Sequence, residues 1–342
     1  MLKSACVSTA VLIAPCLLAG VAAAQTNFVY VDPNAPTSSL ETGTSWSNAV
    51  RFLEDAWSPA ILSTLPPGQD IIVVAARAVY YPRGTNGNVF LGADPSNRRN
   101  WTFNITGEIT GVWGGFVVGQ DPATDQPGGG QSMLSGDVFE AGGSPNGVES
   151  DNANHVVTVI GGDTQVLPLQ LRNLIIHGGH SSPLPAQPGD TGTGSGGSVQ
   201  QLNDPIWVGL NRAYFGAGLF ASGRRIEMSD SSVRNCYAVG GGGIWLDFST
   251  VTRTELVGNR VVIEDNTAQT DGGGILAMPT TSLLLHSAVL RDNRAGRSGG
   301  GAWFDGESTE IRLQSSIVHD NEGASLGGGL YHRGGTDGNS IH

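Results

Sequence analysis

A glycine-rich phrase recurs through the second half of the chain and constrains the fold more than any other feature. In each copy an asparagine precedes a run of three or four glycines, and an aliphatic residue or alanine follows nine positions after the asparagine. The four pairs are Asn235 with Ile244, Asn266 with Ile275, Asn293 with Ala302 and Asn321 with Leu330. The asparagines are spaced by 31, 27 and 28 residues, and a period of this length is typical of stacked structural units.

The repeating unit is built from short strands. Helical repeats need amphipathic helices, which polyglycine would break, whereas each unit here contains two or three short alternating runs, such as those within 274–293. Corresponding strands of successive units would pair in parallel, about 4.8 Å apart. The pattern therefore predicts an all-β fold, a single-stranded parallel β-helix, and the strong bias of parallel crossovers predicts that it is right-handed.

This fold gives each part of the phrase a structural role. Asn235, Asn266, Asn293 and Asn321, at one corner of successive coils, would form a hydrogen-bonded ladder and tolerate a left-handed backbone. Glycine permits positive φ and close approach between coils. The expected corner glycines are Gly272, Gly273, Gly274, Gly299, Gly300, Gly301, Gly327, Gly328 and Gly329. The aliphatic residues that follow them would stack inside the coil.

The chain divides into three predicted parts. Residues 1–24 resemble a secretory signal peptide, with a positive Lys3, a short apolar run and small residues before Gln25. Residues 25–70 are expected to hold an N-terminal strand and a capping helix over 44–57, whose apolar residues form one stripe. Residues 71–342 form the predicted β-helix. It includes a long loop excursion at 181–205 and glycine repeats over 211–342, and we expect it to be incomplete at its C-terminus.

Composition limits the partners. The formal net charge of −12 argues against nucleic acid and against anionic membrane surfaces. Beyond the signal peptide no segment reaches 18 apolar residues, so no transmembrane segment is expected in this chain. Removal of the signal leaves Cys236 as the one cysteine, which excludes an intramolecular disulfide. We expect a secreted protein, extracellular or at the cell surface on the outer membrane.

The repeats resemble those of a known group of surface proteins. The glycine-aliphatic phrase and the preceding aliphatic-x-Asp-Asn phrase, as in 263–266, 290–293 and 318–321, are similar to the repeats of the chlamydial polymorphic outer-membrane proteins. The segments 28–35, 43–56, 70–82, 111–120, 133–138 and 152–159 resemble the opening of pectin-lyase-like β-helix surface proteins of bacteria. The resemblance implies a β-helix whose N-terminal end is capped by a helix, and it leaves the activity open.

Calcium is the one cofactor that the repeat suggests. Asp265, Asp292 and Asp320 should stack in adjacent coils, and a bound Ca²⁺ could relieve their repulsion. The alternative is that these three residues are solvated turn aspartates that bind local backbone N–H groups. A phosphate-binding loop is excluded, because the glycine runs lack a lysine and a following helix.

Catalysis is the alternative to a structural role, because polysaccharide lyases and hydrolases share this fold. A hydrolase needs two or three carboxylates on neighbouring coils. The candidate residues are Asp137, Asp230, Asp247, Asp265, Asp292, Arg234 and Arg291, and they form no tight constellation in the sequence. At least three charged residues converging in a groove beneath a long loop would favour an enzyme.

Five further residues have a structural and a functional interpretation. His177 and His180 are either turn and edge residues or a small metal or acid–base site. Trp245 and Trp303 would form a sugar-stacking stripe if they face outward, and Cys236 fits a small buried position. Together these features predict a structural or adhesive protein without catalysis, with polysaccharide or cell-surface components as partners. The alternative is a secreted lyase or glycoside hydrolase that acts on acidic polysaccharide.

Overall fold

The structure is a computed structural model of the 342-residue chain. It describes residues 26–36, 41–67, 70–84, 100–105, 107–128, 130–137, 153–161, 167–181, 215–249, 252–306 and 310–334. The predicted signal peptide and most of the predicted loop excursion lie outside these residues.

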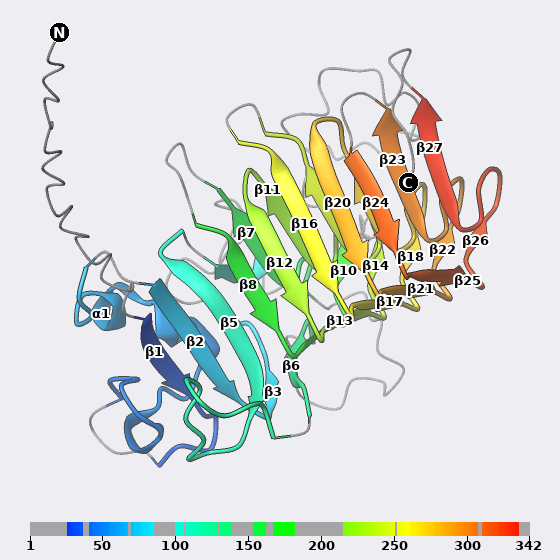
Figure 1. The fold of residues 1–342 in the computed structure, drawn as a ribbon. Coiled ribbons are helices and arrows are strands. Elements are labelled where there is room, and N and C mark those ends of the chain that lie inside the picture. The colour runs from blue at the N-terminus through cyan, green and yellow to red at the C-terminus, as the bar shows by residue number, and fades with distance from the viewer. Residues whose placement is uncertain are drawn as a thin grey trace, which may run out of the picture.

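The described residues form four parallel sheets, which we call A to D in the order in which one coil visits them (Figure 1). Sheet A contains β1 (Thr26–Val31), β2 (Asp70–Ala76), β5 (Ile109–Phe116), β8 (Leu169–Arg172), β12 (Arg225–Ser229), β16 (Thr254–Asn259), β20 (Thr281–His286) and β24 (Glu310–Gln314). Sheet B contains β3 (Val79–Tyr80), β6 (Ser132–Ser135), β9 (Leu174–His177), β13 (Ser232–Arg234), β17 (Val262–Glu264), β21 (Val289–Arg291) and β25 (Ile317–His319).

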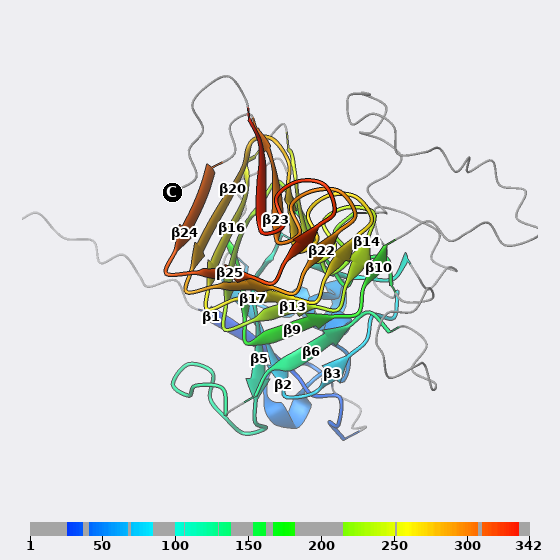
Figure 2. The same ribbon diagram turned by 90° about the vertical axis from the view of Figure 1, so that its right-hand side faces the viewer.

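The other two sheets complete each coil. Sheet C contains β10 (His180–Ser181), β14 (Tyr237–Ala238), β18 (Thr267–Ala268), β22 (Arg294–Ala295) and β26 (Glu322–Gly323). Sheet D contains β4 (Phe103–Ile105), β7 (Val157–Ile160), β11 (Leu219–Ser222), β15 (Ile244–Asp247), β19 (Ile275–Ala277), β23 (Ala302–Gly306) and β27 (Leu330–Gly334). The chain therefore passes through A, B, C and D and returns to A one strand further along, which is the arrangement of a parallel β-helix (Figure 2).

Residues that alternate along each strand fill the interior. Ile244 pairs in register with Ile275, Ile275 with Ala302, and Ala302 with Leu330. The first three of these side chains are fully buried in one continuous core. The predicted internal column is thus confirmed, and burial of such columns supplies the main driving force for folding.

The glycine runs form the corner between sheets C and D. Gly272, Gly299 and Gly327, the first glycine of each run, have φ between 55° and 66°, where a side chain would be strained. A Cβ on Gly274, at the end of a run, would lie 2.5 Å from the carbonyl oxygen of Gly301 in the next coil. Glycine is therefore required here for two reasons, a left-handed backbone at the start of the run and backbone-to-backbone packing after it.

Asparagines form a ladder at the corner between sheets B and C. Asn266 donates through Nδ2 to Oδ1 of Asn293 (3.0 Å), and Asn293 donates in the same way to Asn321 (2.9 Å). Asn235 does not belong to this ladder. Arg234 pairs with Glu264 and Tyr237 with Thr267, so Asn235 lies opposite Asp265 and Cys236 lies opposite Asn266.

The shift at Asn235 has a simple cause. Between sheets C and D the chain has one residue fewer in this coil than in the next, so counting nine positions back from Ile244 lands one residue too early. Asn235 and Asp265 share a left-handed backbone, with φ of 52° and 54°. Asparagine and aspartate both tolerate this conformation, which explains why the substitution is acceptable there.

The N-terminal end is capped, but the predicted helix over 44–57 is wrong. The segment forms two 3-10 turns, η1 (Trp46–Asn48) and η2 (Leu53–Trp57), followed by a short helix α1 (Pro59–Leu62). Between the turns Val50 runs extended, forms a parallel bridge with Val31 and donates to the Tyr30 carbonyl (3.0 Å). Pairing with the exposed edge of β1 thus overrides the helical period.

The cap still buries its apolar stripe. Val50, Leu53 and Trp57 are each at most 3% exposed and belong to the central core. Pro59 begins α1 instead of ending a helix, and the Ser58 side chain accepts from the Ile61 N–H. Proline at the first helical position costs no hydrogen bond.

Arginine–carboxylate pairs connect successive coils on the surface. Every basic residue after Lys3, histidines aside, is arginine. Arg260 holds Asp230 through Nε and Nη2, and Arg333 holds Asp305 in the same way. The planar guanidinium fork matches a carboxylate one strand away better than a lysine ammonium would.

Candidate functional site

A groove of about 960 Å³ lies on the outer face of sheet A. It lies near the carboxyl ends of β5, β8, β12 and β16 and is bounded on one side by the loop that follows β5. Its lining consists of Trp113, Phe116, Pro122, Ala123, Asp125, Gln126, Pro127, Arg172, Asn173, Glu227, Met228, Ser229, Asp230, Val257, Asn259 and Arg260.

Strand alternation places the groove floor outside the core. Val112 and Leu171 point inward and are fully buried, so Trp113 and Arg172, which follow them and pair in register, point outward. The Arg172 guanidinium lies over the Trp113 ring at 4.5 Å from its centroid. This cation–π contact holds the long arginine side chain on the floor of the groove.

The loop wall is anchored by its own polar side chains. Gln120 accepts from the Val117 N–H (2.7 Å) through Oε1 and donates to the Gln126 carbonyl (3.0 Å) through Nε2. Its own carbonyl accepts from Trp46 Nε1 at 2.7 Å. Asp125 accepts from the Asp121 N–H at 2.8 Å. The wall is therefore a folded loop tied to the cap segment.

Ion pairs neutralise much of the charge at the groove. Arg260 donates to both carboxylate oxygens of Asp230, each at 2.6 Å. The neighbouring Arg225 contacts Glu227 at 3.0 Å. Both pairs are substantially exposed, with side-chain exposures of 58% and 46% for Arg260 and Asp230. They order the rim of the groove more than they stabilise the fold, because exposed pairs contribute little.

The candidate catalytic residues are dispersed. Asp230 is the one of the seven that lines the groove. Asp137 follows β6, and Asp247 is buried at the end of β15 on sheet D. Arg234 and Arg291 lie on the outer face of sheet B, on either side of Glu264.

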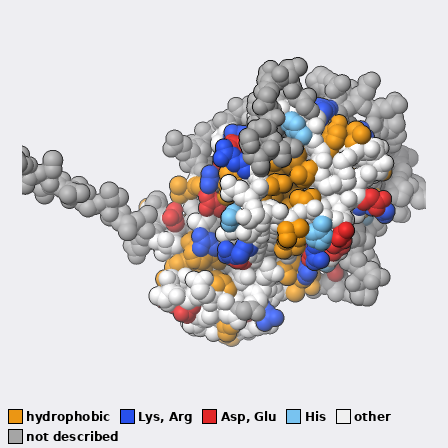
Figure 3. Space-filling model, turned by 45° about the vertical axis from the view of Figure 1, so that its right-hand side comes forward, with side chains coloured by type: hydrophobic (Ala, Val, Ile, Leu, Met, Phe, Trp, Pro, Cys, Tyr) orange, Lys and Arg blue, Asp and Glu red, His pale blue; other side chains and the backbone are white. Residues whose placement is uncertain are grey.

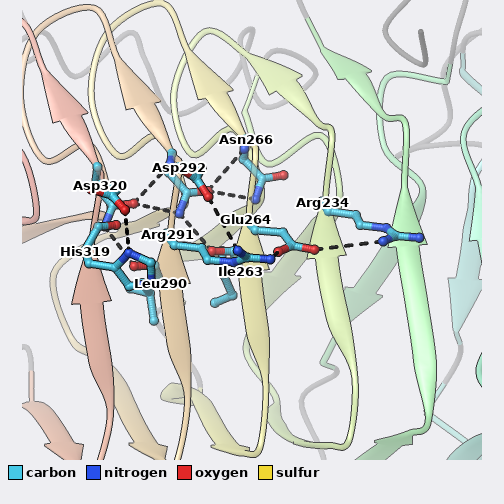
Figure 4. A network of polar contacts seen from close by, with 11 residues as sticks. Arg234, Ile263, Glu264, Asn266, Leu290, Arg291, Asp292, His319 and Asp320 are labelled. Atoms are coloured by element: carbon cyan, nitrogen blue, oxygen red, sulfur yellow. Dashed lines mark hydrogen bonds and ion pairs between the residues drawn. The ribbon is translucent and has the colours of Figure 1, made fainter.

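Glu264 links the two arginines across three coils (Figure 4). Arg291 hydrogen-bonds to Glu264 Oε2, and Arg234 lies 3.9 Å from Oε1. Glu264 is 8% exposed, so a carboxylate that would be costly to bury alone is held between two cations. Arg291 is thus best explained by pairing, and its pKa is raised by the hydrogen bond to Glu264.

The three aspartates considered as calcium ligands lie next to the ion-paired side chains of sheet B. Asp265, Asp292 and Asp320 occupy the same left-handed corner position in successive coils, with φ between 52° and 55°. Asp292 contacts Arg291 at 3.9 Å and Asp320 contacts His319 at 2.7 Å. Burial, Glu264 and Asp292 together raise the pKa of Asp265. Within the described part of the chain no group of three or more His, Cys, Asp or Glu side chains is arranged to hold a metal ion.

The two histidines lie on different sheets. His177 is on sheet B next to Arg234 in register, and burial and the arginine charge lower its pKa while Asp137 opposes them. His180 is on sheet C and stacks on Tyr237 at 4.8 Å. The structure therefore does not bring His177 and His180 together on one strand face.

The tryptophan stripe is covered. Trp245, Leu276, Trp303 and Tyr331 pair in register on the outer face of sheet D. Trp245 is 6% exposed and Trp303 is 3% exposed, because they pack with Phe215, Phe220 and Val239 in a second apolar cluster. An exposed sugar-stacking stripe at these residues is therefore wrong. The column forms a small second core outside the coil.

Cys236 is a small buried residue, as expected. It is 1% exposed, and burial raises the pKa of its thiol to about 12. Its backbone N–H donates to Oδ1 of Asn266 (3.1 Å), as the N–H of Asn266 does to Asn293. Cys236 thus occupies the ladder position of its coil.

The sequence interpretation missed most of the groove. Trp113, Arg172 and Glu227 come from three strands distant in sequence, and Arg260 directly follows a fourth, β16; none of them belongs to the repeat phrase. Alternation within 109–116 could have placed Trp113 outside the coil. The residues that lie beside Trp113 in the groove can be identified only from the register of the strands.

Comparisons with known proteins identify no relative. No family model, no curated protein and no solved structure matches the chain. Among the described residues no helix has the length and apolar character to cross a membrane.

Proposed function

We propose that this protein is a secreted or cell-surface right-handed β-helix with a structural or adhesive role, and that the groove on sheet A is its ligand-binding surface. The ligand class that fits is a polysaccharide or another cell-surface glycan. The observation that carries the proposal is the 960 Å³ groove, with Trp113 and Arg172 on its floor and hydrogen-bonding side chains around them. Ligand sites combine apolar surface with a few placed polar groups in this way.

The state of the carboxylates supports binding over catalysis. Asp230 is held by Arg260, Glu227 by Arg225, and Asp125 accepts hydrogen bonds from its own loop. A general acid for glycoside hydrolysis needs a carboxyl group whose environment keeps it protonated. Asp230 and Glu227 are instead exposed side chains (46% and 38%) that already pair with arginines at an open rim, and carboxylate oxygens of this kind can accept hydrogen bonds from ligand hydroxyl groups.

Binding to insoluble and soluble glycans tests the proposal. We expect the chain to bind at least one polysaccharide, with a change in tryptophan fluorescence, and Arg172→Ala and Trp113→Ala to weaken binding at least tenfold. Arg294→Ala is the matched control, because Arg294 is an exposed arginine (64% of the side chain) on sheet C. Equal binding by all four proteins would show that the groove is not the binding surface.

A polysaccharide lyase or hydrolase acting on acidic polysaccharide is the second candidate. One observation favours it: five charged residues, Asp125, Arg172, Glu227, Asp230 and Arg260, converge in the groove below a loop. Incubation with uronate polymers, with and without Ca²⁺, separates the two candidates. Release of unsaturated products that absorb in the ultraviolet, or of new reducing ends, would replace the binding proposal with an enzymatic one.

A further inference from the structure

The outer face of sheet B carries a row of apolar side chains along the described coils. Leu134, Ile176, Val233, Ile263 and Leu290 point into the core, so the residue before each of them points outward. These outward residues pair in register from strand to strand, and serine is the one polar member among them. The row consists of Val79, Met133, Ile175, Ser232, Val262, Val289 and Ile317.

The sheet B row has no apolar partner among the described residues. Parallel sheets usually have both faces covered, and sheet D follows this rule, since Trp245 and Trp303 on its outer face pack with Phe215. The apolar members of the sheet B row, by contrast, belong to none of the three apolar clusters. Val79 and Ile317, at its two ends, are 43% and 58% exposed, and the apolar members between them are partly exposed. A contiguous apolar surface of this kind marks an interaction site.

Charged side chains border the row on the side of the asparagine ladder (Figure 4). This border holds two arginines and four carboxylates, so it is net negative. Burial, Glu264 and Asp292 raise the pKa of Asp265, which shows that the carboxylates repel one another. Figure 3 shows hydrophobic side chains beside charged ones on the face that comes forward. The charged members of the border are Arg234, Glu264 and Arg291 on the strands and Asp265, Asp292 and Asp320 at the corner after them.

The dimensions of the row and its border fit one α-helix. From β6 to β25 the row crosses five strand spacings, or about 24 Å, and a helix of about 16 residues has this length. Asp265 lies three residues beyond Val262, about 10 Å along the chain, and a helix with its side chains is about 10–12 Å wide. A helix that lies on the row therefore brings one flank to the aspartates. The α-helix of the described residues, α1, has 4 residues and lies in the cap, so it cannot fill this place.

We propose that the outer face of sheet B is the docking surface for a basic amphipathic helix of a partner protein. The apolar stripe of the helix covers the row, and lysines or arginines along one flank pair with Asp265, Asp292 and Asp320. Amphipathic helices are recognised through such apolar stripes, and complementary charge fixes their register and speeds association. No member of the row lines the groove on sheet A, so the two surfaces are separate.

Fluorescence anisotropy with a labelled model helix tests the proposal on the full chain. The probe is a peptide of about 18 residues in which leucines form one helical stripe and lysines fill the other positions. We expect micromolar binding, because one row is smaller than a standard interface, and we expect it to weaken as salt is added. A matched peptide with glutamate in place of lysine should not bind.

Two row variants separate apolar docking from simple attraction between opposite charges. Val289→Glu and Ile317→Glu each add a negative charge, which would strengthen a purely electrostatic contact. Docking through the row predicts at least tenfold weaker binding instead, because the added carboxylate would be buried against leucine. Ile317 is 58% exposed, so its substitution leaves the core packing intact. Asp292→Asn should weaken binding severalfold and reduce its salt dependence. Leu284→Glu is the matched control and should bind as the parent does, because Leu284 is partly exposed on β20 of sheet A.

Three results would overturn the proposal. The first is a parent chain that does not bind the lysine peptide at any salt concentration. The second is binding by Val289→Glu and Ile317→Glu that is as tight as that of the parent. The third is a loss of affinity in Leu284→Glu as large as in the row variants. The circular dichroism spectrum and thermal midpoint of each variant distinguish these results from a folding defect.

Discussion

Removal of one rung tests whether the asparagine ladder stabilises the fold. Asn293 is 1% exposed, and its side chain makes four hydrogen bonds. Nδ2 donates to the Ile263 carbonyl (2.8 Å) and to Asn321 Oδ1 (2.9 Å). Oδ1 accepts from the N–H (3.2 Å) and Nδ2 (3.0 Å) of Asn266. Asn293→Ala removes these four hydrogen bonds from a buried corner.

The expected cost follows from those four hydrogen bonds. Each lost intramolecular hydrogen bond costs about 1 kcal/mol net, and a buried group left unpaired costs more, so Asn293→Ala should lower the free energy of unfolding by about 4 kcal/mol. Asn321→Ala removes the outermost described rung, whose side chain lies in a more exposed coil, and should cost about half as much.

Urea denaturation followed by circular dichroism measures the difference. A solenoid can unfold in segments, so hydrogen exchange of the amides in β17 to β22 should be measured beside the bulk transition. We expect the loss of stability to appear as faster exchange in these coils. Asn259→Ala is the control, since Asn259 lies on the outer face of sheet A. If Asn293→Ala costs no more than this control, the ladder does not stabilise the corner and the reasoning is refuted.

Three further predictions concern the corners and the cap. Cys236→Asn should add a rung and raise stability by about 1 kcal/mol, seen as a higher thermal midpoint, because its position already donates to Asn266 Oδ1. Gly274→Ala should destabilise by several kcal/mol in urea, since its Cβ would lie 2.5 Å from the Gly301 carbonyl oxygen. Burial raises the pKa of Glu54 from 4.5 to about 7, so the contribution of Glu54 to folding stability is fully present below pH 4.5 and is lost as the pH rises through 7. Between pH 5 and 8, the free energy of unfolding of Glu54→Gln should fall by about 3 kcal/mol less than that of the parent in denaturation curves.

These predictions have distinct controls. Gly329→Ala serves for the corner, because Gly329 is also the last glycine of its run but its Cβ would meet only Val318 Cγ1, at 3.2 Å. A loss there as large as that of Gly274→Ala would show that the close approach to the next coil is not the cause. A Cys236→Asn protein less stable than the parent would show that the thiol site lacks room for the amide. If stability depends on pH in the same way in Glu54→Gln and in the parent, Glu54 is not the group whose titration causes the loss.

The solenoid could be predicted from the repeat because every coil has to satisfy the same local constraints. Positive φ and close backbone approach demand glycine at the corner, and a shared buried turn position suits asparagine. These demands depend on local geometry, so they leave a period in the sequence. The same logic fails for Asn235, where a turn shorter by one residue moves Cys236 into the ladder position.

The cap and the groove depend on contacts that no local pattern encodes. An apolar stripe over 44–57 fits a helix, but pairing of Val50 with the edge of β1 competes with it and prevails. Trp245 and Trp303 lie outside the coil as alternation predicts, and only packing against Phe215 and Phe220 shows that they are covered. The residues of the groove can be placed together only when the register of four strands is known.

The central claim is that coils stack in register, and a distance across them tests it most directly. Ser229 pairs with Asn259, Asn259 with His286 and His286 with Gln314, so Ser229 and Gln314 are three strands apart on the outer face of sheet A. At about 4.8 Å per strand their Cα atoms should lie about 14 Å apart. Nitroxide labels at Ser229→Cys and Gln314→Cys, with Cys6 and Cys16 replaced by serine and the buried Cys236 retained, should give one narrow distribution by pulsed electron resonance, centred near that spacing once the label arms are included. A broad distribution, or one centred at more than about twice that spacing, would contradict the stacked-coil account.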